Sequence, residues 1–509
     1  MANIFDYLKW RGDLSLRVSP FNEVDNLILS QLAMFDLGGL VPASPLEGSV
    51  FLGEAMDAYF EDEKRAVRPL GAIIPVELVE MGRQVGKSPR FREMKLTGYV
   101  NSVDENSEKQ FAALTVELGD RSWYIAFRGT DDTIVGWKED FNLAFRSPVP
   151  SQLAAVEYLE RVAAQTQGRL RVGGHSKGGN LAVYAAVKCT PKTKRRIRSV
   201  YNNDGPGFSH EFLSLPEYGV MADRIITILP QSSVVGMLFE NDQRYHVVKS
   251  TENGIMQHNA LSWEVLGTQL VRMDALTQES RDISALLNGW MQDLTLEDRR
   301  KLVEGVFQIL LSTKATTVTE LADDKAALVR AVRTADKETR RLLLHYFGIL
   351  FGKGSKLVIG NLLAFVTGGN KKEEKALLAE KLKEEVEKQK QAQAQEQTHE
   401  PKTELKHEPK TKLKHVPTTV SAGQGERNHT SLSPKKKPAA PLLAHEKHAH
   451  APCHVRRKGG KRKGRLPFLD WLFCTPARKK HKHNVHTRKS VSIVSSVKTT
   501  ELLEEQDHE

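Results

Sequence analysis

Between about residues 95 and 250, short apolar runs typical of strands alternate with stretches of helical periodicity. Two of these runs, 114–118 and 123–127, flank Gly119 and Asp120, and this spacing predicts a hairpin. Further elements are expected in the same region, namely a helix at 181–187 and strands at 170–173, 199–202, 224–229 and 245–249. Because strands separated by helices form parallel sheets that are covered on both faces, the pattern predicts an α/β fold with a mostly parallel sheet.

The pattern becomes purely helical after about residue 284. Thr295 and Asp298 predict a capping box, and apolar residues follow at helical spacing as far as residue 311. Two later apolar runs, 342–351 and 357–366, are each ten residues long, whereas a membrane span needs about 20 continuous apolar residues. Buried bundle helices or a shallow interfacial hairpin therefore fit these two runs better than a span.

Composition and charge divide the chain further. The 509 residues are 40% hydrophobic, which is enough for a real core. The formal charge of +11 is unevenly spread, because residues 371–509 hold 31 Lys and Arg against 18 Asp and Glu, or +13, and the first 370 residues carry −2. Pro, Thr, His and Lys dominate from residue 398 to about 444, and such a composition cannot bury enough surface to become ordered. We therefore predict an α/β domain over 1–285, a helical segment over 286–369, a charged helix over 370–397 and a disordered basic tail over 398–509.

Cysteine usage and the N-terminal residues point to a compartment. The chain has three cysteines, Cys189, Cys453 and Cys474, too few for a disulfide framework and without zinc-finger spacing. The first 20 residues mix Asp, Arg and Lys with apolar residues and hold no apolar stretch of the kind an export signal needs. These features predict a cytoplasmic protein.

The most informative motif is Gly174-His175-Ser176-Lys177-Gly178, a G-x-S-x-G pentapeptide between a predicted strand and a helix rich in small residues. A nucleophilic serine needs this context, because the flanking glycines permit a strained turn that exposes the hydroxyl. The backbone N–H of Lys177 would then point to the position of an oxyanion. Gly129, at the end of an earlier strand, allows the close backbone approach that a second oxyanion donor requires.

These motifs carry a family resemblance. The chain resembles the FRG[ST]…W…D…GHSxGG pattern of class 3 (fungal-type) lipases at Phe127-Arg128-Gly129-Thr130, Trp137, Asp140 and Gly174-His175-Ser176-Lys177-Gly178-Gly179. The strings 136–141, 203–208 and 247–250 are more specifically similar to a bacterial branch of lipase-like proteins, the Mbeg-like family. The resemblance covers about residues 1–285 and implies an α/β-hydrolase fold with an ester- or lipid-hydrolase ancestry. It further implies that Thr130 supplies the second oxyanion donor and that Arg128 and Asp140 are structural.

A base and an acid must complete the site. The base is expected downstream of the serine, and His258 is preferred because it follows a predicted strand by a glycine-containing loop; His246, within that strand, is the alternative. His175 is expected to be a packing residue that points away from the serine hydroxyl. The lipases carry their acid in a turn after the strand matched by 224–229, where this chain has Pro230-Gln231-Ser232-Ser233-Val234 and no carboxylate. Asp204, after the preceding strand, is the predicted substitute, and a turn cap is its alternative role.

The tail suggests a second kind of contact. A basic run at 456–465 is followed at once by an aromatic and apolar segment at 466–473. This combination suits an anionic membrane surface, which attracts the charges while the apolar segment inserts. Non-specific nucleic-acid binding, less favoured, and a short partner-binding motif in a solvated tail are the alternatives.

The sequence therefore predicts a cytoplasmic serine hydrolase of the lipase/esterase type that acts on an acyl ester or lipid, with the tail allowing peripheral binding at the inner membrane surface. Ser176 would attack the acyl carbonyl, His258 would transfer the proton and Asp204 would orient His258. The amides of Thr130 and Lys177 would hold the oxyanion, and no metal or cofactor is needed. A catalytically weak hydrolase-fold scaffold that binds lipid or protein partners is the alternative, because the lipase carboxylate is missing from its usual turn.

Overall fold

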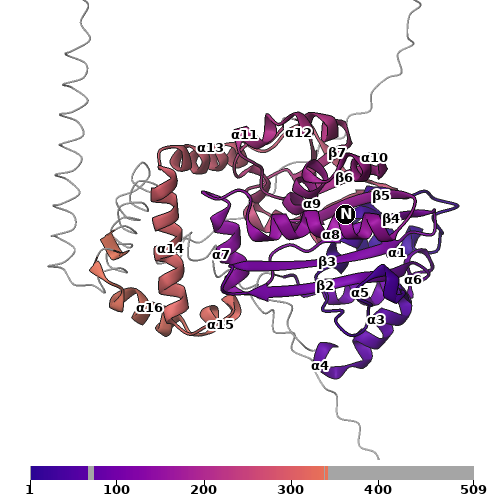
Figure 1. The fold of residues 1–509 in the computed structure, drawn as a ribbon. Coiled ribbons are helices and arrows are strands. Elements are labelled where there is room, and N and C mark those ends of the chain that lie inside the picture. Colours follow the sequence, from indigo (N-terminus) through magenta and orange to yellow (C-terminus); the bar gives the residue numbers. More distant parts are fainter. Residues whose placement is uncertain (1, 67–73, 243, 338, 342–509) are drawn as a thin grey trace, which may run out of the picture. The chain divides into compact units, whose positions relative to one another are not determined.

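The computed structural model describes residues 2–66, 74–242, 244–337 and 339–341 (Figure 1). The chain divides into two units, and residues 2–331 belong to the first, which is the one described below. The predicted apolar runs at 342–351 and 357–366, the charged helix at 370–397 and the basic tail at 398–509 lie outside the described residues.

Nine strands of the described chain form one sheet in the order β1-β2-β3-β4-β5-β6-β7-β8-β11. The strands are β1 Val50–Phe51, β2 Lys95–Asp104, β3 Lys109–Glu117, β4 Ser122–Phe127, β5 Arg169–His175, β6 Ile197–Asn203, β7 Ile225–Pro230, β8 Tyr245–Val248 and β11 Arg272–Met273. A separate antiparallel pair consists of β9 Val265–Leu266 and β10 Gln269–Leu270.

The centre of the large sheet is parallel. Strands β4 to β8 are mutually parallel and stand in chain order, while the pairs from β1 to β4 and the pair β8–β11 are antiparallel. Gly119, with φ of 63°, lies in the turn between β3 and β4, so the predicted hairpin is confirmed. The expectation of an α/β fold is confirmed, but its sheet is mixed, with the parallel part confined to the five central strands.

Helices precede the sheet, connect its parallel strands and follow it. The α-helices are α1 Ile4–Arg11, α2 Glu23–Leu32, α3 Leu52–Glu61, α4 Glu63–Ala66, α5 Glu77–Lys87, α6 Pro89–Arg92, α7 Ile134–Asn142, α8 Pro150–Gln165, α9 Lys177–Lys188, α10 Pro191–Arg196, α11 His210–Leu213, α12 Pro216–Met221, α13 Gln278–Gln292, α14 Leu296–Ser312, α15 Val318–Asp323 and α16 Lys325–Thr334. Short 3₁₀ turns are η1 Pro45–Glu47, η2 Ala222–Arg224, η3 Val235–Met237, η4 Gly254–His258 and η5 Ala260–Ser262. Among the described residues, no helix has both the length and the apolarity to cross a membrane.

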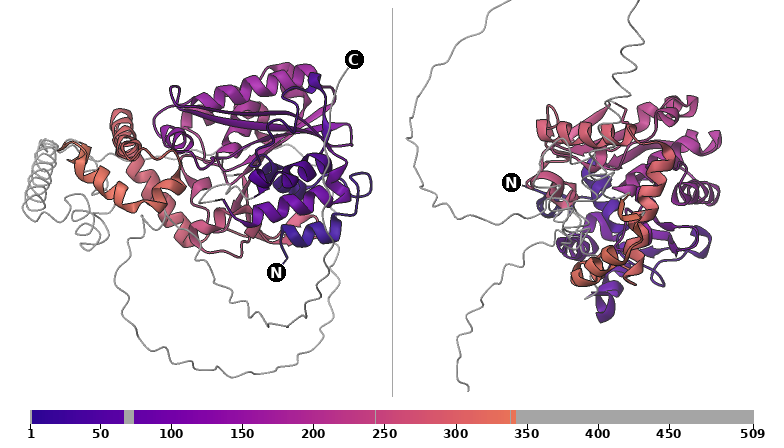
Figure 2. Two further views of the ribbon diagram at one scale, coloured as in Figure 1. Left: turned by 90° about the horizontal axis from the view of Figure 1, so that it is seen from below. Right: turned by 90° about the vertical axis from the view of Figure 1, so that its left-hand side faces the viewer.

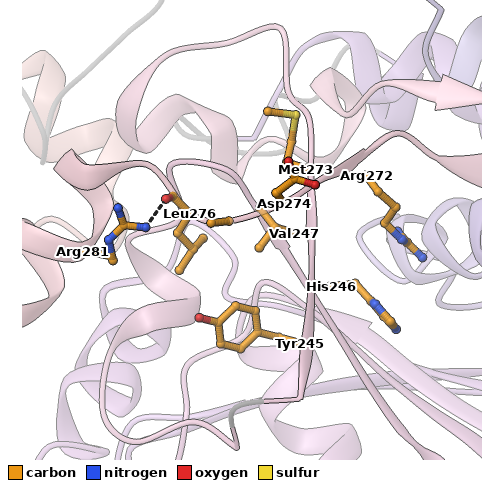
Figure 3. A pocket seen from close by; sticks show the side chains of 9 residues that line it. Tyr245, His246, Val247, Arg272, Met273, Asp274, Leu276 and Arg281 are labelled. Carbon is orange, nitrogen blue, oxygen red and sulfur yellow. Dashed lines mark hydrogen bonds between the residues drawn. The ribbon is translucent and has the colours of Figure 1, made fainter.

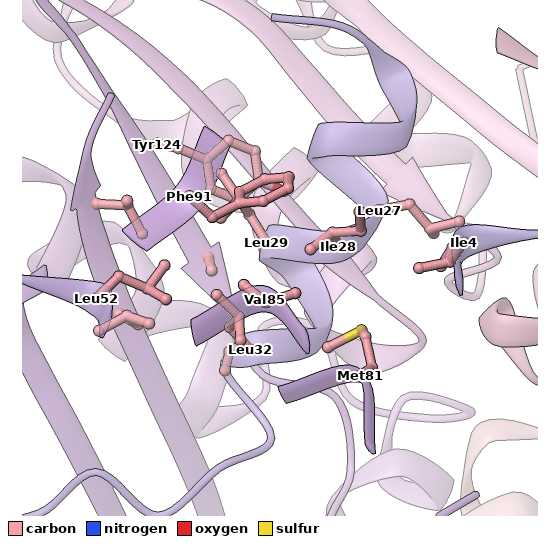
Figure 4. Close-up of a cluster of buried hydrophobic side chains, with 14 of the residues drawn as sticks. Ile4, Leu27, Ile28, Leu29, Leu32, Leu52, Met81, Val85, Phe91 and Tyr124 are labelled. Carbon is pink, nitrogen blue, oxygen red and sulfur yellow. The ribbon is translucent and has the colours of Figure 1, made fainter. Parts of the chain in front are cut away.

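Apolar side chains cover both faces of the sheet. Successive residues of a strand point to opposite faces, and in β4 Ile125 and Phe127 join one buried cluster while Tyr124 and Ala126 join another. The first cluster is completed by α8 and α9, and the second by the N-terminal helices α1, α2, α3 and α5 (Figures 2 and 4). Because both faces are covered, the parallel strands are buried and their carboxyl ends can carry functional loops.

Helix α2 connects the N-terminal layer to those loops. Its N-cap Asn22 accepts hydrogen bonds from the amides of Val24 and Asp25. One turn further on, Asn26 Nδ2 donates to Asn203 Oδ1 at the end of β6, at 2.9 Å, and Asn26 Oδ1 accepts from the Tyr124 hydroxyl at 2.8 Å. These buried polar contacts tie the first part of the chain to the residue that precedes Asp204.

Helices α14 and α15, which follow the sheet, pack on α7 in a separate apolar cluster. Val303 and Phe307 of α14 pack with Ile134 of α7 and Leu321 of α15. Thr295 is the N-cap of α14 and accepts from the amide of Asp298, as predicted. The Asp298 carboxylate, however, accepts from the Thr295 hydroxyl at 2.7 Å, so the reciprocal backbone contact of a capping box is replaced by a side-chain contact.

Candidate active site

Ser176 lies on a sharp turn between β5 and α9. Its backbone has φ of 58° and ψ of −134°, a strained conformation for a residue with a side chain. Glycines make the turn possible, because a Cβ at Gly178 would lie 2.1 Å from the carbonyl oxygen of Phe127 and one at Gly174 would lie 2.3 Å from the backbone of Gly178. The strand–turn–helix context predicted for Ser176 is therefore present.

Asp204, directly after β6, and His258, at the end of η4, contact each other through their side chains. His258 Nδ1 lies 2.7 Å from Asp204 Oδ2, and the carboxylate is fully buried while a quarter of the imidazole is exposed. The other oxygen, Oδ1, accepts from the Ser233 hydroxyl at 2.5 Å and from the Gly236 amide at 3.2 Å. The turn at the position where the lipases carry their acid thus supplies two hydrogen-bond donors, the Ser233 hydroxyl and the Gly236 amide, to the carboxylate of Asp204.

Hydrogen bonds place Ser176 beside this pair. The Ser176 amide donates to the carbonyl of Asn203, the residue before Asp204, at 3.0 Å. Nε2 of His175, the residue before Ser176, lies 2.8 Å from the carbonyl oxygen of His258. Within the described part of the chain the Ser176 hydroxyl makes no hydrogen bond, and catalytic hydrogen bonds are often formed only when substrate binds.

His175 packs as predicted, and it packs on His258. The two ring centroids are 4.5 Å apart with an interplanar angle of 32°. Burial, assisted by the nearby His258, lowers the pKa of His175 to about 3, so this ring is neutral at physiological pH. Since a carbonyl can only accept, the neutral ring carries its proton on Nε2 and donates it to the His258 carbonyl.

The predicted oxyanion side is built from the loop after β4. A Cβ at Gly129 would lie 2.8 Å from the His175 carbonyl oxygen and 3.2 Å from Ser176 Cβ, so this loop passes directly against the serine turn. The Thr130 hydroxyl donates to Asp140, and the buried Arg128 forms an ion pair with the partly exposed Asp131 at 2.8 Å. Thr130 and the first residue of α9, Lys177, therefore lie on two segments that meet at Ser176.

Comparison with known proteins finds a family that part of the chain resembles. A family model described as Mbeg1-like matches residues 85–308. The matched segment, less than half of the chain, is similar to this family. A solved structure entitled "Crystal structure of M37 lipase" is similar to the chain at 14% identity, over 54% of this chain and 96% of that chain, with a TM-score of 0.27. At that score the likeness supports no conclusion. A search of curated proteins found no match.

Two other histidines lie within the described residues, His210 and His246. His210 is exposed and lies 3.1 Å from Glu240, and His345 is outside the described residues. His246, the alternative base, is exposed on β8 and lines a pocket of about 490 Å³ at the β8–β11 edge of the sheet (Figure 3). Neither Ser176 nor Asp204 lines this pocket. Among the residues that the structure describes, no group of three or more His, Cys, Asp and Glu side chains could hold a metal ion.

Sequence reasoning missed several residues around the proposed site. It assigned no role to the Lys177 side chain, to Glu139, or to the pair Ser233 and Gly236. The lysine ammonium is buried and lies 3.1 Å from the fully buried carboxylate of Glu139. The adjacency of Glu139 and Asp140, together with a lysine in the serine motif, was the available signal.

Proposed function

We propose that this protein is a serine hydrolase of the lipase/esterase type with an α/β-hydrolase fold. The observation that carries the proposal is the 2.7 Å contact between His258 Nδ1 and the buried Asp204 carboxylate beside a strained serine turn. A buried acid that binds one imidazole nitrogen leaves the other as a base, which is the arrangement that activates a serine. The Mbeg1-like match over 85–308 agrees with a lipase-like hydrolase.

In this mechanism Ser176 Oγ attacks the acyl carbonyl while His258 Nε2 takes its proton. Asp204 keeps the proton of the neutral ring on Nδ1 and stabilises the imidazolium as it forms. The amides of Thr130 and Lys177 stabilise the oxyanion, because both segments meet at the serine and α9 directs its positive end there. His258 then gives the proton to the leaving alcohol. In the second half of the reaction water attacks the acyl carbonyl, and His258 takes a proton from the water and gives it to Ser176 Oγ as the acyl group leaves.

We propose an acyl ester or lipid as substrate and a cytoplasmic location. The basic run at 456–465 and the apolar segment at 466–473 support peripheral binding to an anionic membrane surface. Nucleic acid is the less favoured partner of the same charges.

Labelling with a fluorophosphonate probe tests the proposal directly. Wild-type protein should be labelled and should hydrolyse short p-nitrophenyl esters, whereas Ser176→Ala should do neither and should melt at the same temperature. Equal labelling of the two proteins would reject Ser176 as the nucleophile. A folded wild-type protein that is neither labelled nor active would favour the scaffold that binds lipid or protein.

A further inference from the structure

The side chain of Lys177 is the least expected feature of the serine turn. Only 1% of it is exposed, and its ammonium lies 2.5 Å from Gln110 Oε1, 3.1 Å from the Gln110 carbonyl and 3.1 Å from Glu139 Oε2. A lysine is rarely buried unless it is paired, because removing its charge from water is costly. A buried ammonium next to a nucleophile therefore calls for an explanation beyond packing.

Glu139 neutralises part of the positive charge of Lys177. Its carboxylate is fully buried and accepts from the Gln110 amide at 3.0 Å and from the Ser151 amide at 2.7 Å, in addition to Lys177. Two backbone donors already satisfy this carboxylate in addition to the lysine. The remaining electrostatic partner of the ammonium is Asp140.

Asp140 stands between Lys177 and the predicted oxyanion loop. Its Oδ1 lies 3.7 Å from the Lys177 ammonium and accepts no hydrogen bond from the described residues. Its Oδ2 accepts from the Thr130 hydroxyl. One oxygen therefore faces the charge and the other fixes the threonine whose amide is a proposed oxyanion donor.

The ionisation of Asp140 depends on its neighbours. Although 27% of the Asp140 side chain is exposed, its partial burial raises the pKa to about 6, and the Lys177 ammonium and the Thr130 hydroxyl oppose this rise. Glu139 on the same helix and Asp131 in the loop raise the pKa of Asp140 further, because each adds negative charge. The pKa is therefore close enough to neutrality for the loss of one positive charge to protonate the carboxyl.

We propose that Lys177 is a positioning residue whose buried ammonium keeps Asp140 ionised, so that Asp140 holds Thr130 and its loop against Ser176. The inference rests on the proposed hydrolase function. An ionised carboxylate accepts a stronger and shorter hydrogen bond than a neutral acid, so protonation of Asp140 loosens Thr130. The amide of Lys177 is a separate contribution that a side-chain replacement leaves in place.

Carboxyl titration in the full-length protein tests the first half of the proposal. Aspartate labelled with ¹³C at the carboxyl is followed by NMR, and the Asp140 signal is identified by its loss in Asp140→Asn. An opposite charge at this range shifts a carboxyl pKa by about 1–3 units, so Lys177→Met should raise the Asp140 midpoint by that amount. Lys177→Arg, which keeps the charge, should leave the Asp140 midpoint close to its wild-type value.

Lys138→Met is the matched control. This lysine is on α7, the helix that also holds Asp140, but it pairs with Glu108 at 2.6 Å. It should leave the Asp140 midpoint unchanged. An unchanged midpoint in Lys177→Met, or an equal shift in Lys138→Met, would overturn the proposal.

The second half concerns Thr130 and is read in two ways. The ¹⁵N amide shift of Thr130 should titrate with the Asp140 midpoint and should lose this titration in Asp140→Asn. The acid limb of fluorophosphonate labelling should move to higher pH in Lys177→Met by about the same amount, and Lys177→Met added to Asp140→Asn should move it no further. A residue that only stabilises the fold would lower labelling equally at all pH values, and that result would count against the proposal.

The two proposals fail in different ways. If wild-type protein is not labelled at any pH, the hydrolase function is rejected, and the Asp140 and Thr130 titrations still decide whether Lys177 positions the loop. If Lys177→Met does not fold, Asp140→Asn decides instead, because a Thr130 amide that still titrates near pH 6 in that variant contradicts the proposal.

Discussion

Replacement of Asp204 by asparagine should inactivate the proposed hydrolase while leaving its fold in place. The structure dictates how the new amide must lie. Oδ1 accepts from Ser233 and Gly236, so the amide oxygen must take that position and the amide nitrogen must face His258. Since an NH₂ group can only donate, His258 Nδ1 then has to accept, and its proton moves to Nε2. A ring protonated on Nε2 cannot take the proton of Ser176.

The expected loss of turnover is about 10⁴-fold, the scale found when a triad acid is replaced in this way. This corresponds to about 5 kcal/mol of activation free energy. The two hydrogen bonds to Oδ1 survive the change and the contact with His258 is kept with its direction reversed, so the thermal unfolding midpoint should stay close to that of wild type.

The assay is p-nitrophenyl ester hydrolysis near pH 7.5, with thermal unfolding measured on the same samples. Asp242→Asn is the control, because Asp242 forms an ion pair with Arg244 at 2.6 Å near the surface and should change turnover by less than about threefold, or about 0.7 kcal/mol. Turnover of Asp204→Asn within that same range would refute the reasoning and would point to another acid or to a Ser-His dyad.

Two further predictions concern the support of the acid and the tail. In Gly236→Ala the added Cβ would lie 2.4 Å from Asp204 Oδ1, so the carboxylate must move and ester turnover should fall by about 10²-fold; unchanged turnover would show that its position is not critical. Deletion of 452–485 should reduce sedimentation with anionic liposomes and leave turnover of a soluble ester nearly unchanged, and a protein that binds RNA but never liposomes would instead favour the nucleic-acid interpretation.

The parallel strands and the serine turn could be predicted because their signals are local. A short apolar run, two glycines around Ser176 and a helix of small residues follow one another within the sequence. Asp204 and His258 were chosen because each follows a predicted strand, and the structure brings their side chains together. Their catalytic roles and the oxyanion roles of Thr130 and Lys177 remain predictions.

The parts that could not be predicted depend on contacts between distant residues. Hydrophobic pattern assigns a charged residue to the surface, so it could not reveal that Lys177 and Glu139 neutralise each other inside the protein. The turn at 230–236 contains no carboxylate, and its donation to Asp204 becomes visible only when β6 and β7 lie side by side. The central parallel strands were predicted from alternation, whereas the antiparallel edges of the sheet required knowledge of the pairing.

The Asn26 contacts of helix α2 bear on how this protein can be divided. The family match begins at residue 85, yet Asn26 is bound to Asn203, and α1, α2 and α3 cover Tyr124 and Ala126. A polypeptide of residues 85–308 alone would expose that face to water, at about 1.5–3 kcal/mol for each large apolar side chain. The matched region is therefore not an autonomous folding unit, and any transplant of it into another protein must carry the N-terminal helices with it.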